Sequence, residues 1–143
     1  MPSGLENKLC AADWIWENWS RVFPDRFKKI DREHHVYGDI VPTDERMGWA
    51  IDFVADFQTK RYLIEVDINN SSRDVWHGYK IFGYRAAYCI DRNIRIGKVG
   101  VMIFAHDRVY NPRVRNMLAV SGLEYCMFRE DKGSWWPTKT SLW

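Results

Sequence analysis

The segment from residue 62 to residue 68 constrains the fold of this chain more than any other. It reads Tyr-Leu-Ile-Glu-Val-Asp-Ile, an apolar and β-branched run that only Glu65 and Asp67 interrupt. Such a run is typical of a strand that is buried on both faces of a sheet. The two acids are two residues apart, so their side chains leave the same face of that strand. A carboxylate inside a protein is costly unless it meets a cation or hydrogen-bond donors.

The segment before this strand predicts the strand's partner. Residues 49–56 alternate between two faces with a period of two, and residues 58–61 are polar and turn-like. A hairpin would then bring Asp52 near Glu65 and Asp67, and three carboxylates on paired strands suggest a divalent-metal site. A solvated strand face is the alternative, but the apolar character of residues 62–68 favours the metal site. The alternation places Trp49, Ile51, Phe53 and Ala55 on one face and Asp52, Val54 and Asp56 on the other.

The chain before the hairpin predicts a helix and a charged strand or loop. Ser3 and Glu6 have the spacing of a capping box, and a stripe of aromatic and aliphatic residues follows at helical spacing until Pro24. We therefore expect a helix over residues 4–23. The strongly charged residues 26–35 predict a solvated loop or an edge strand, and residues 36–41 a short strand.

The chain after the hairpin changes period. An apolar stripe at helical spacing predicts one helix, residues 99–105 predict another buried strand, and residues 123–128 a last strand. Pro112 and Gly122 stand where the first turn and the C′ position of a helix favour them. The tryptophan-rich tail, residues 133–143, either lies across the domain or meets a partner. The stripe of the first of these helices consists of Val75, Tyr79, Phe82, Ala86 and Ile90.

These elements predict a single α/β domain over residues 1–143. Their order is helix, three strands, helix, strand, helix, strand. The passage from Leu63 to Ala105 requires a parallel crossover, which is right-handed by default. The expected architecture is a mixed β-sheet flanked by helices on both faces.

Composition sets looser bounds on function. The net charge of +2 and the pI of 8.4 permit nucleic-acid binding through local basic patches without requiring it. Cys10, Cys89 and Cys126 are widely spaced, so neither a zinc site nor a disulfide framework is expected. No stretch has the pattern of a signal peptide or a membrane span. We expect a cytoplasmic protein in a reducing compartment, without membrane partners.

The order of elements, combined with Asp52 and the Glu65-Val66-Asp67 run, resembles the restriction-endonuclease-like superfamily, the PD-(D/E)xK nucleases. In that family an Asp at the start of the second core strand and an acid-x-Lys on the third bind magnesium and activate water. The core of the match runs from about residue 47 to residue 105. Asp52 matches the first Asp and Glu65 the acid of the second half-motif, while Ile51 stands where Pro is often found.

Asp67 stands where that family has its lysine, and a carboxylate cannot copy the electrostatic role of an ammonium. The Glu-x-Asp form resembles the branch that contains the very-short-patch repair endonucleases, although Asp67 is not followed by the glycine usual there. Alternatively the lysine has migrated to Lys80 on the next helix, on one face with Tyr84, from which it could reach back to Glu65.

The resemblance implies a metal-dependent nuclease acting on DNA. Mg²⁺ or Mn²⁺ would be held by Asp52, Glu65 and the Val66 carbonyl, with Asp67 as a further ligand. Lys80 or Arg73 would clamp the phosphate. Glu6 could supply an outer-shell ligand, although its position in the capping box explains it better.

Further DNA contacts are expected from a basic cluster flanking Tyr110, which consists of Arg108, Arg113 and Arg115. A solvated helix start explains these arginines about as well. The second functional class is a nuclease-like fold without activity that serves as a nucleic-acid-binding or protein-interaction subunit. Since a chain of 143 residues has little room for a specificity domain, a homodimer or a larger complex is also expected.

Overall fold

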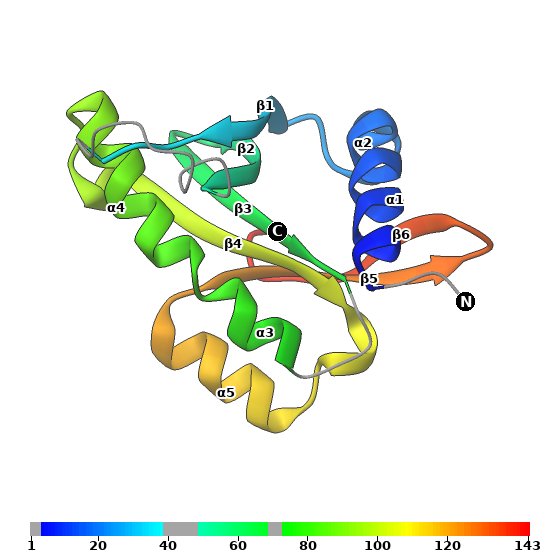
Figure 1. Ribbon diagram of the computed structural model, residues 1–143. Coiled ribbons are helices and arrows are strands. Elements are labelled where there is room, and N and C mark those ends of the chain that lie inside the picture. The colour runs from blue at the N-terminus through cyan, green and yellow to red at the C-terminus, as the bar shows by residue number, and fades with distance from the viewer. Residues whose placement is uncertain (1–3, 39–48, 69–72) are drawn as a thin grey trace.

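The computed structural model of the protein describes residues 4–38, 49–68 and 73–143 and contains one six-stranded sheet. The order of strands in the sheet is their order in the sequence (Figure 1). The strands are β1 (Phe27–His35), β2 (Ala50–Phe57), β3 (Lys60–Asp67), β4 (Val99–His106), β5 (Glu124–Asp131) and β6 (Ser134–Thr140). The helices are α1 (Gly4–Glu17), α2 (Trp19–Val22), α3 (Arg73–Gly78), α4 (Ile81–Arg92) and α5 (Pro112–Ser121), with short 3-10 turns η2 (Ile96–Lys98) and η3 (Asp107–Val109).

The sheet is mixed, as the sequence predicts. Strands β1, β2 and β3 are antiparallel neighbours, β3, β4 and β5 run parallel, and β6 returns antiparallel to β5. Helices α1 and α2 cover one face of the sheet, and α3, α4 and α5 cover the other (Figure 1). The predicted α/β architecture, a mixed sheet flanked by helices on both faces, is therefore confirmed. No helix in the described ranges is long and apolar enough to span a membrane.

The face under α1 and α2 is packed with aromatic rings, and we call it the aromatic core. Trp19 lies at its centre, with ring-centroid distances of 4.5 Å to Phe23 and 4.9 Å to Phe27. Its indole Nε1 donates a hydrogen bond of 2.7 Å to the Phe27 carbonyl oxygen. The remaining large members of this core are Phe53, Phe57, Tyr62, Phe104, Phe128 and Trp135.

The face under α3, α4 and α5 is mainly aliphatic, and we call it the aliphatic core. It contains Leu63 of β3 together with Val101, Ile103 and Ala105 of β4. Gly78 at the end of α3 lies so close to β4 that a Cβ atom at this position would stand 2.3 Å from the Ile103 Cδ1 atom. This close approach sets α3 directly on the sheet beside β3.

The helix predicted from the stripe between Val75 and Ile90 is two helices. The chain turns between α3 and α4, where the amide of Lys80 donates to the His77 carbonyl at 3.3 Å. The break shifts the helical phase, so Val75 is buried but Ile90 is half exposed. The residues that α4 buries instead are Ile81, Ala87, Tyr88 and Cys89.

Residues 26–35 and residues 36–41 can also be compared with the predictions. The charged residues 26–35 contain the edge strand β1, which was one of the two expectations. The strand expected over residues 36–41 is wrong in its described part. There the Tyr37 and Gly38 amides donate to the Asp91 carboxylate at 2.8 and 2.7 Å, which ties the chain to the end of α4. Residues 39–41, like Ser3, lie outside the described residues.

The tryptophan-rich tail lies across the domain and adds a strand that the sequence does not reveal. Residues 134–140 form β6, Trp135 is buried in the aromatic core, and Trp136 lies edge-on to Trp14 at 5.7 Å. Trp143 packs against Phe27 at 5.0 Å between ring centroids. The tail therefore completes one of the two cores.

Candidate metal centre

Glu65 and Asp67 occupy the carboxyl-terminal half of β3 and are both buried. Their exposed fractions are 1% and 6%. They share a face of β3 with Leu63, which belongs to the aliphatic core, so both carboxylates face the side covered by α3 and α4. The expectation that the two acids leave one face of a doubly buried strand is confirmed.

Lys80 contacts Glu65, which was one of the alternatives in the sequence analysis, but it does so from the turn between α3 and α4 and not from a helix. The Lys80 Nζ atom lies 3.1 Å from the Glu65 Oε1 atom. Lys80 stands in the turn between α3 and α4, and its side chain is 46% exposed while that of Glu65 is 1% exposed. The break between the two helices therefore places the partly exposed side chain of Lys80 against the buried carboxylate of Glu65.

Asp52 lies on the neighbouring strand, against the residue that follows Glu65. Its Oδ2 atom accepts a hydrogen bond of 2.8 Å from the Val66 amide. The backbone pairing of β2 with β3 ends at Phe53 and Ile64. Beyond that point the Val66 amide is bound by the Asp52 side chain. Since the N–H and C=O of one strand residue point to the same neighbouring strand, the Val66 carbonyl also faces the side of Asp52.

The alternation predicted for β2 holds from Phe53 to Phe57 and fails at Ile51. Phe53, Ala55 and Phe57 pack in the aromatic core and Val54 in the aliphatic core, but Ile51 also packs in the aliphatic core. The strand leaves β3 at this point, which changes the direction of its side chains. Asp52 lies in this part of β2, where its carboxylate accepts from the Val66 amide.

The oxygen donors at this end of β3 fit a magnesium ion. Mg²⁺ prefers hard oxygen ligands and is commonly held by one or two carboxylates, with water completing the shell. Asp52, Glu65 and the Val66 carbonyl are oxygen donors of this kind on two neighbouring strands. Within residues 4–38, 49–68 and 73–143, no three His, Cys, Asp or Glu side chains gather as a ligand group. The three predicted carboxylates therefore do not form a cluster by themselves, and Asp67 lies one pleat further along β3.

The remaining predicted site residues are dispersed. Glu6 and Arg73 belong to α1 and α3, but their side chains lie outside the described residues. Tyr84 is half-buried against the aliphatic core. Arg113 and Arg115 are two apart on α5 and line two different hollows, because residues at this spacing leave different sides of a helix. Arg108 is exposed in η3, so the three arginines do not form one basic patch.

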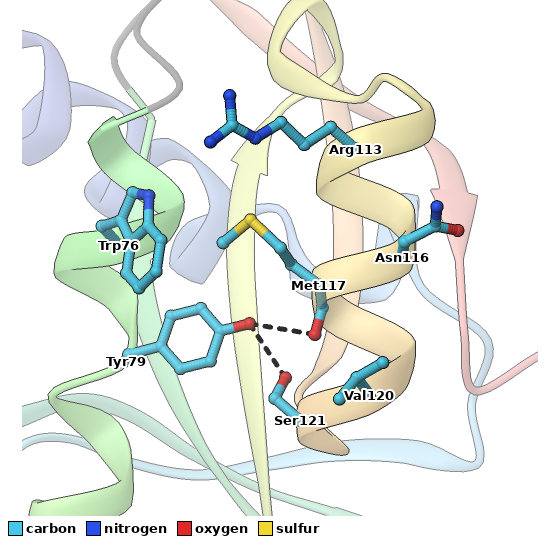
Figure 2. A pocket seen from close by; sticks show the side chains of 7 residues that line it. All are labelled: Trp76, Tyr79, Arg113, Asn116, Met117, Val120 and Ser121. Carbon is cyan, nitrogen blue, oxygen red and sulfur yellow. Dashed lines mark hydrogen bonds between the residues drawn. The ribbon is translucent and has the colours of Figure 1, made fainter.

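A hollow between α3 and α5 was not expected from the sequence. It has a volume of about 690 Å³, and its walls include Trp76 and Tyr79 on one side and Arg113 and Met117 on the other (Figure 2). Trp76 is 61% exposed, which is unusual for a tryptophan that is not at a binding surface. The signal that could have found it is a tryptophan outside the apolar stripe, four residues before Lys80.

His106 is the third buried polar side chain in the described part of the chain and belongs to a different place. It ends β4, and its ring lies edge-on to Trp135 at 5.9 Å. Its Nδ1 atom accepts a hydrogen bond of 3.1 Å from the Arg108 amide. Burial lowers the pKa of His106 below its ordinary value, so the ring is neutral at neutral pH.

Comparison with known proteins adds a fold relationship. No protein-family model matches the chain, and no curated protein matches its sequence. A solved structure of an XisH family protein from Nostoc punctiforme PCC 73102 superposes with a TM-score of 0.55 over 92% of this chain and 98% of that chain. The two sequences are 11% identical. The likeness is one of fold. It gives no support for the very-short-patch repair branch in particular.

Proposed function

We propose that this protein is a metal-dependent nuclease that hydrolyses phosphodiester bonds in DNA, with Asp52, Glu65 and the Val66 carbonyl holding Mg²⁺ or Mn²⁺. The observation that carries the proposal is the contact between Lys80 and Glu65. The Lys80 ammonium group lies 3.1 Å from the buried Glu65 carboxylate, and Asp52 of the next strand accepts from the Val66 amide at 2.8 Å. These contacts support the assignment of Asp52 and Glu65 as the acids and of Lys80 as the lysine of the nuclease motif.

The residues of this chain divide the work of such a reaction. When bound, Mg²⁺ would polarise the phosphate and lower the pKa of a coordinated water. Asp52 is oriented by the Val66 amide, which donates to its Oδ2 atom at 2.8 Å, and its carboxylate would be a ligand of the ion. Lys80 changes partner from Glu65 to the phosphate, where its charge stabilises the developing negative charge. Its half-exposed side chain permits that exchange.

A second candidate is a nuclease-like fold that binds nucleic acid or protein without cutting. The same ion pair also favours this candidate, because Lys80 balances the charge of Glu65 without a metal ion. Asp67 in place of the motif lysine also favours it. The two candidates differ in whether a metal ion displaces Lys80 from Glu65.

Two measurements on one set of proteins decide between the candidates. Mn²⁺ binding is measured by calorimetry, and cutting is measured on plasmid, branched and single-stranded DNA with Mg²⁺ or Mn²⁺. The variants are Asp52→Asn and Glu65→Gln. The control is Asp56→Asn, which removes another half-buried acid of β2 whose carboxylate pairs with Arg61 at 2.9 Å.

The nuclease proposal expects Mn²⁺ binding and cutting in the native protein and in Asp56→Asn, and the loss of both in the two site variants. Binding of DNA without cutting in either metal selects the second candidate. Cutting that survives Glu65→Gln and Asp52→Asn would remove these residues from the mechanism.

A further inference from the structure

The hollow between α3 and α5 is an open, mainly apolar depression. Figure 2 shows Arg113 and Met117 reaching from α5 toward Trp76 and Tyr79. Its volume of about 690 Å³ is within the range of sites that hold small organic groups. Trp76 and Tyr79 lie four residues and one residue before Lys80 in the chain, and Lys80 contacts Glu65.

We propose that this hollow binds an unpaired nucleobase of the DNA strand, stacked on Trp76. The proposal rests on the proposed nuclease function and adds the class of substrate: DNA with a single-stranded or extruded nucleotide. Duplex DNA without an unpaired base would not fill the site.

The aromatic wall is built to be rigid while leaving one ring open. The Tyr79 hydroxyl is bound to the Met117 carbonyl at 3.2 Å and to the Ser121 hydroxyl at 2.9 Å, which fixes Tyr79 against α5. The Tyr79 ring stacks on Phe82 at 5.8 Å and contacts Trp76 at 5.8 Å. Trp76 is supported on one side and remains 61% exposed. A supported, exposed indole is the kind of platform on which bases stack.

Charge favours nucleic acid over a protein partner. Among the described residues that line the hollow, Arg113 is the charged one, and none of them carries a carboxylate. A base on Trp76 would bring its phosphate to a rim that carries a guanidinium group. Tryptophan, methionine and arginine are also frequent in protein interfaces. The exposed indole of Trp76 and the guanidinium group of Arg113 together favour the polyanion.

The test is the binding of a fluorescently labelled oligothymidine to the full chain in EDTA, which prevents cutting, beside a blunt duplex of equal length. Because Trp76 is mostly exposed, Trp76→Ala should fold normally. The control is Ile96→Ala, which removes another exposed apolar side chain, on η2. Loss of one stacked base should weaken binding about 5- to 150-fold. Trp76→Phe should recover most of the loss, and Arg113→Gln should reduce the salt dependence of binding.

The outcomes separate this proposal from the nuclease proposal. If oligothymidine binds Trp76→Ala as tightly as the native protein, or if the blunt duplex binds through Trp76 equally well, the base site is wrong even when Asp52→Asn abolishes cutting. If binding depends on Trp76 but no metal supports cutting, the base site stands and the nuclease proposal falls. If the native chain binds no oligonucleotide and Trp76→Ala abolishes its self-association in a mass measurement, the hollow is a protein interface.

Discussion

The two faces of the sheet are packed with different kinds of side chain, aromatic on one face and mainly aliphatic on the other. The aromatic core under α1 and α2 consists largely of interlocking rings, and the carboxylates of β3 point away from it. The aliphatic core under α3, α4 and α5 is built from smaller side chains and shares its face with Glu65 and Asp67. Both faces use the same strands, because alternate residues of β3 and β4 point to opposite sides.

This difference suggests a division between the two faces: one mainly stabilises the fold, and the other carries the candidate site. Aromatic rings bury large areas and tolerate little rearrangement, so the face under α1 and α2 secures the fold. Buried carboxylates lower stability unless they are compensated, and they are retained where a site needs them. If the division is real, substitutions on the two faces should have separable effects on stability and on activity.

The largest effect on stability is expected for Trp19→Ala. This substitution removes a ring that contacts Phe23, Phe27, Phe53 and Phe104 and a hydrogen bond to a buried carbonyl. It should lower the free energy of unfolding by about 3–5 kcal/mol. Urea denaturation measures the change, and Trp76→Ala on the other face provides the matched comparison, with an expected change within about 0.5 kcal/mol. Equal losses would contradict the division.

Lys80→Met should affect activity next most strongly. Removal of the ammonium group should slow DNA cutting by about 10²–10³-fold, since the charge that stabilises the transition state is lost. The same change leaves Glu65 buried without its ion-pair partner, so Mn²⁺ should raise the melting temperature of the variant more than that of the native protein. Lys80→Arg should restore part of the activity. A smaller metal-induced shift in Lys80→Met would argue against a shared place for metal and lysine.

Two glycines test the packing of each face. A Cβ atom at Gly100 would stand 2.3 Å from the Tyr62 ring in the aromatic core, and one at Gly78 would stand 2.3 Å from the Ile103 Cδ1 atom in the aliphatic core. Gly100→Ala should cost about 1–3 kcal/mol, because a ring cannot move aside easily. Gly78→Ala should cost less, because a terminal methyl group can rotate away. Chemical denaturation of both variants measures which substitution lowers the free energy of unfolding more.

The smallest effect is a pH dependence from His106, which lies against Trp135 on the aromatic side. Because its pKa is lowered in the folded state, the unfolded chain binds more protons as the pH falls below about 6.5. Stability should therefore be fully present above that pH and decline as the pH falls toward the folded pKa. Between about pH 7 and pH 5, the free energy of unfolding should fall less steeply with decreasing pH in His106→Gln than in the native protein. An unchanged slope would assign the decline to other groups.

Much of the fold could be predicted because local signals and tertiary structure agree. The apolar run of β3 identified a central strand, and the spacing of Glu65 and Asp67 placed both acids on one face. The ends of α5 also follow from local rules. Asn111 accepts a hydrogen bond of 2.9 Å from the Val114 amide, and Gly122 adopts a φ of 72° after the helix.

The remainder depends on contacts between distant segments. β6 exists because it pairs with β5, and its sequence, with Pro137 inside, has little strand character of its own. The break between α3 and α4 follows from the close approach of Gly78 to Ile103, which no helical periodicity reveals. The hollow beside Trp76 needs α3 and α5 side by side, and its walls come from segments more than thirty residues apart.

The order of the six strands has a consequence for synthesis on the ribosome. Each strand lies beside the strand that precedes it in the chain, so the sheet can extend one strand at a time as the polypeptide emerges. The acids of β3 would leave the exit tunnel before α3, Lys80 and β4 are available to cover them. The nascent chain therefore passes through a stage in which β3, with Glu65 and Asp67, forms the open border of the growing sheet.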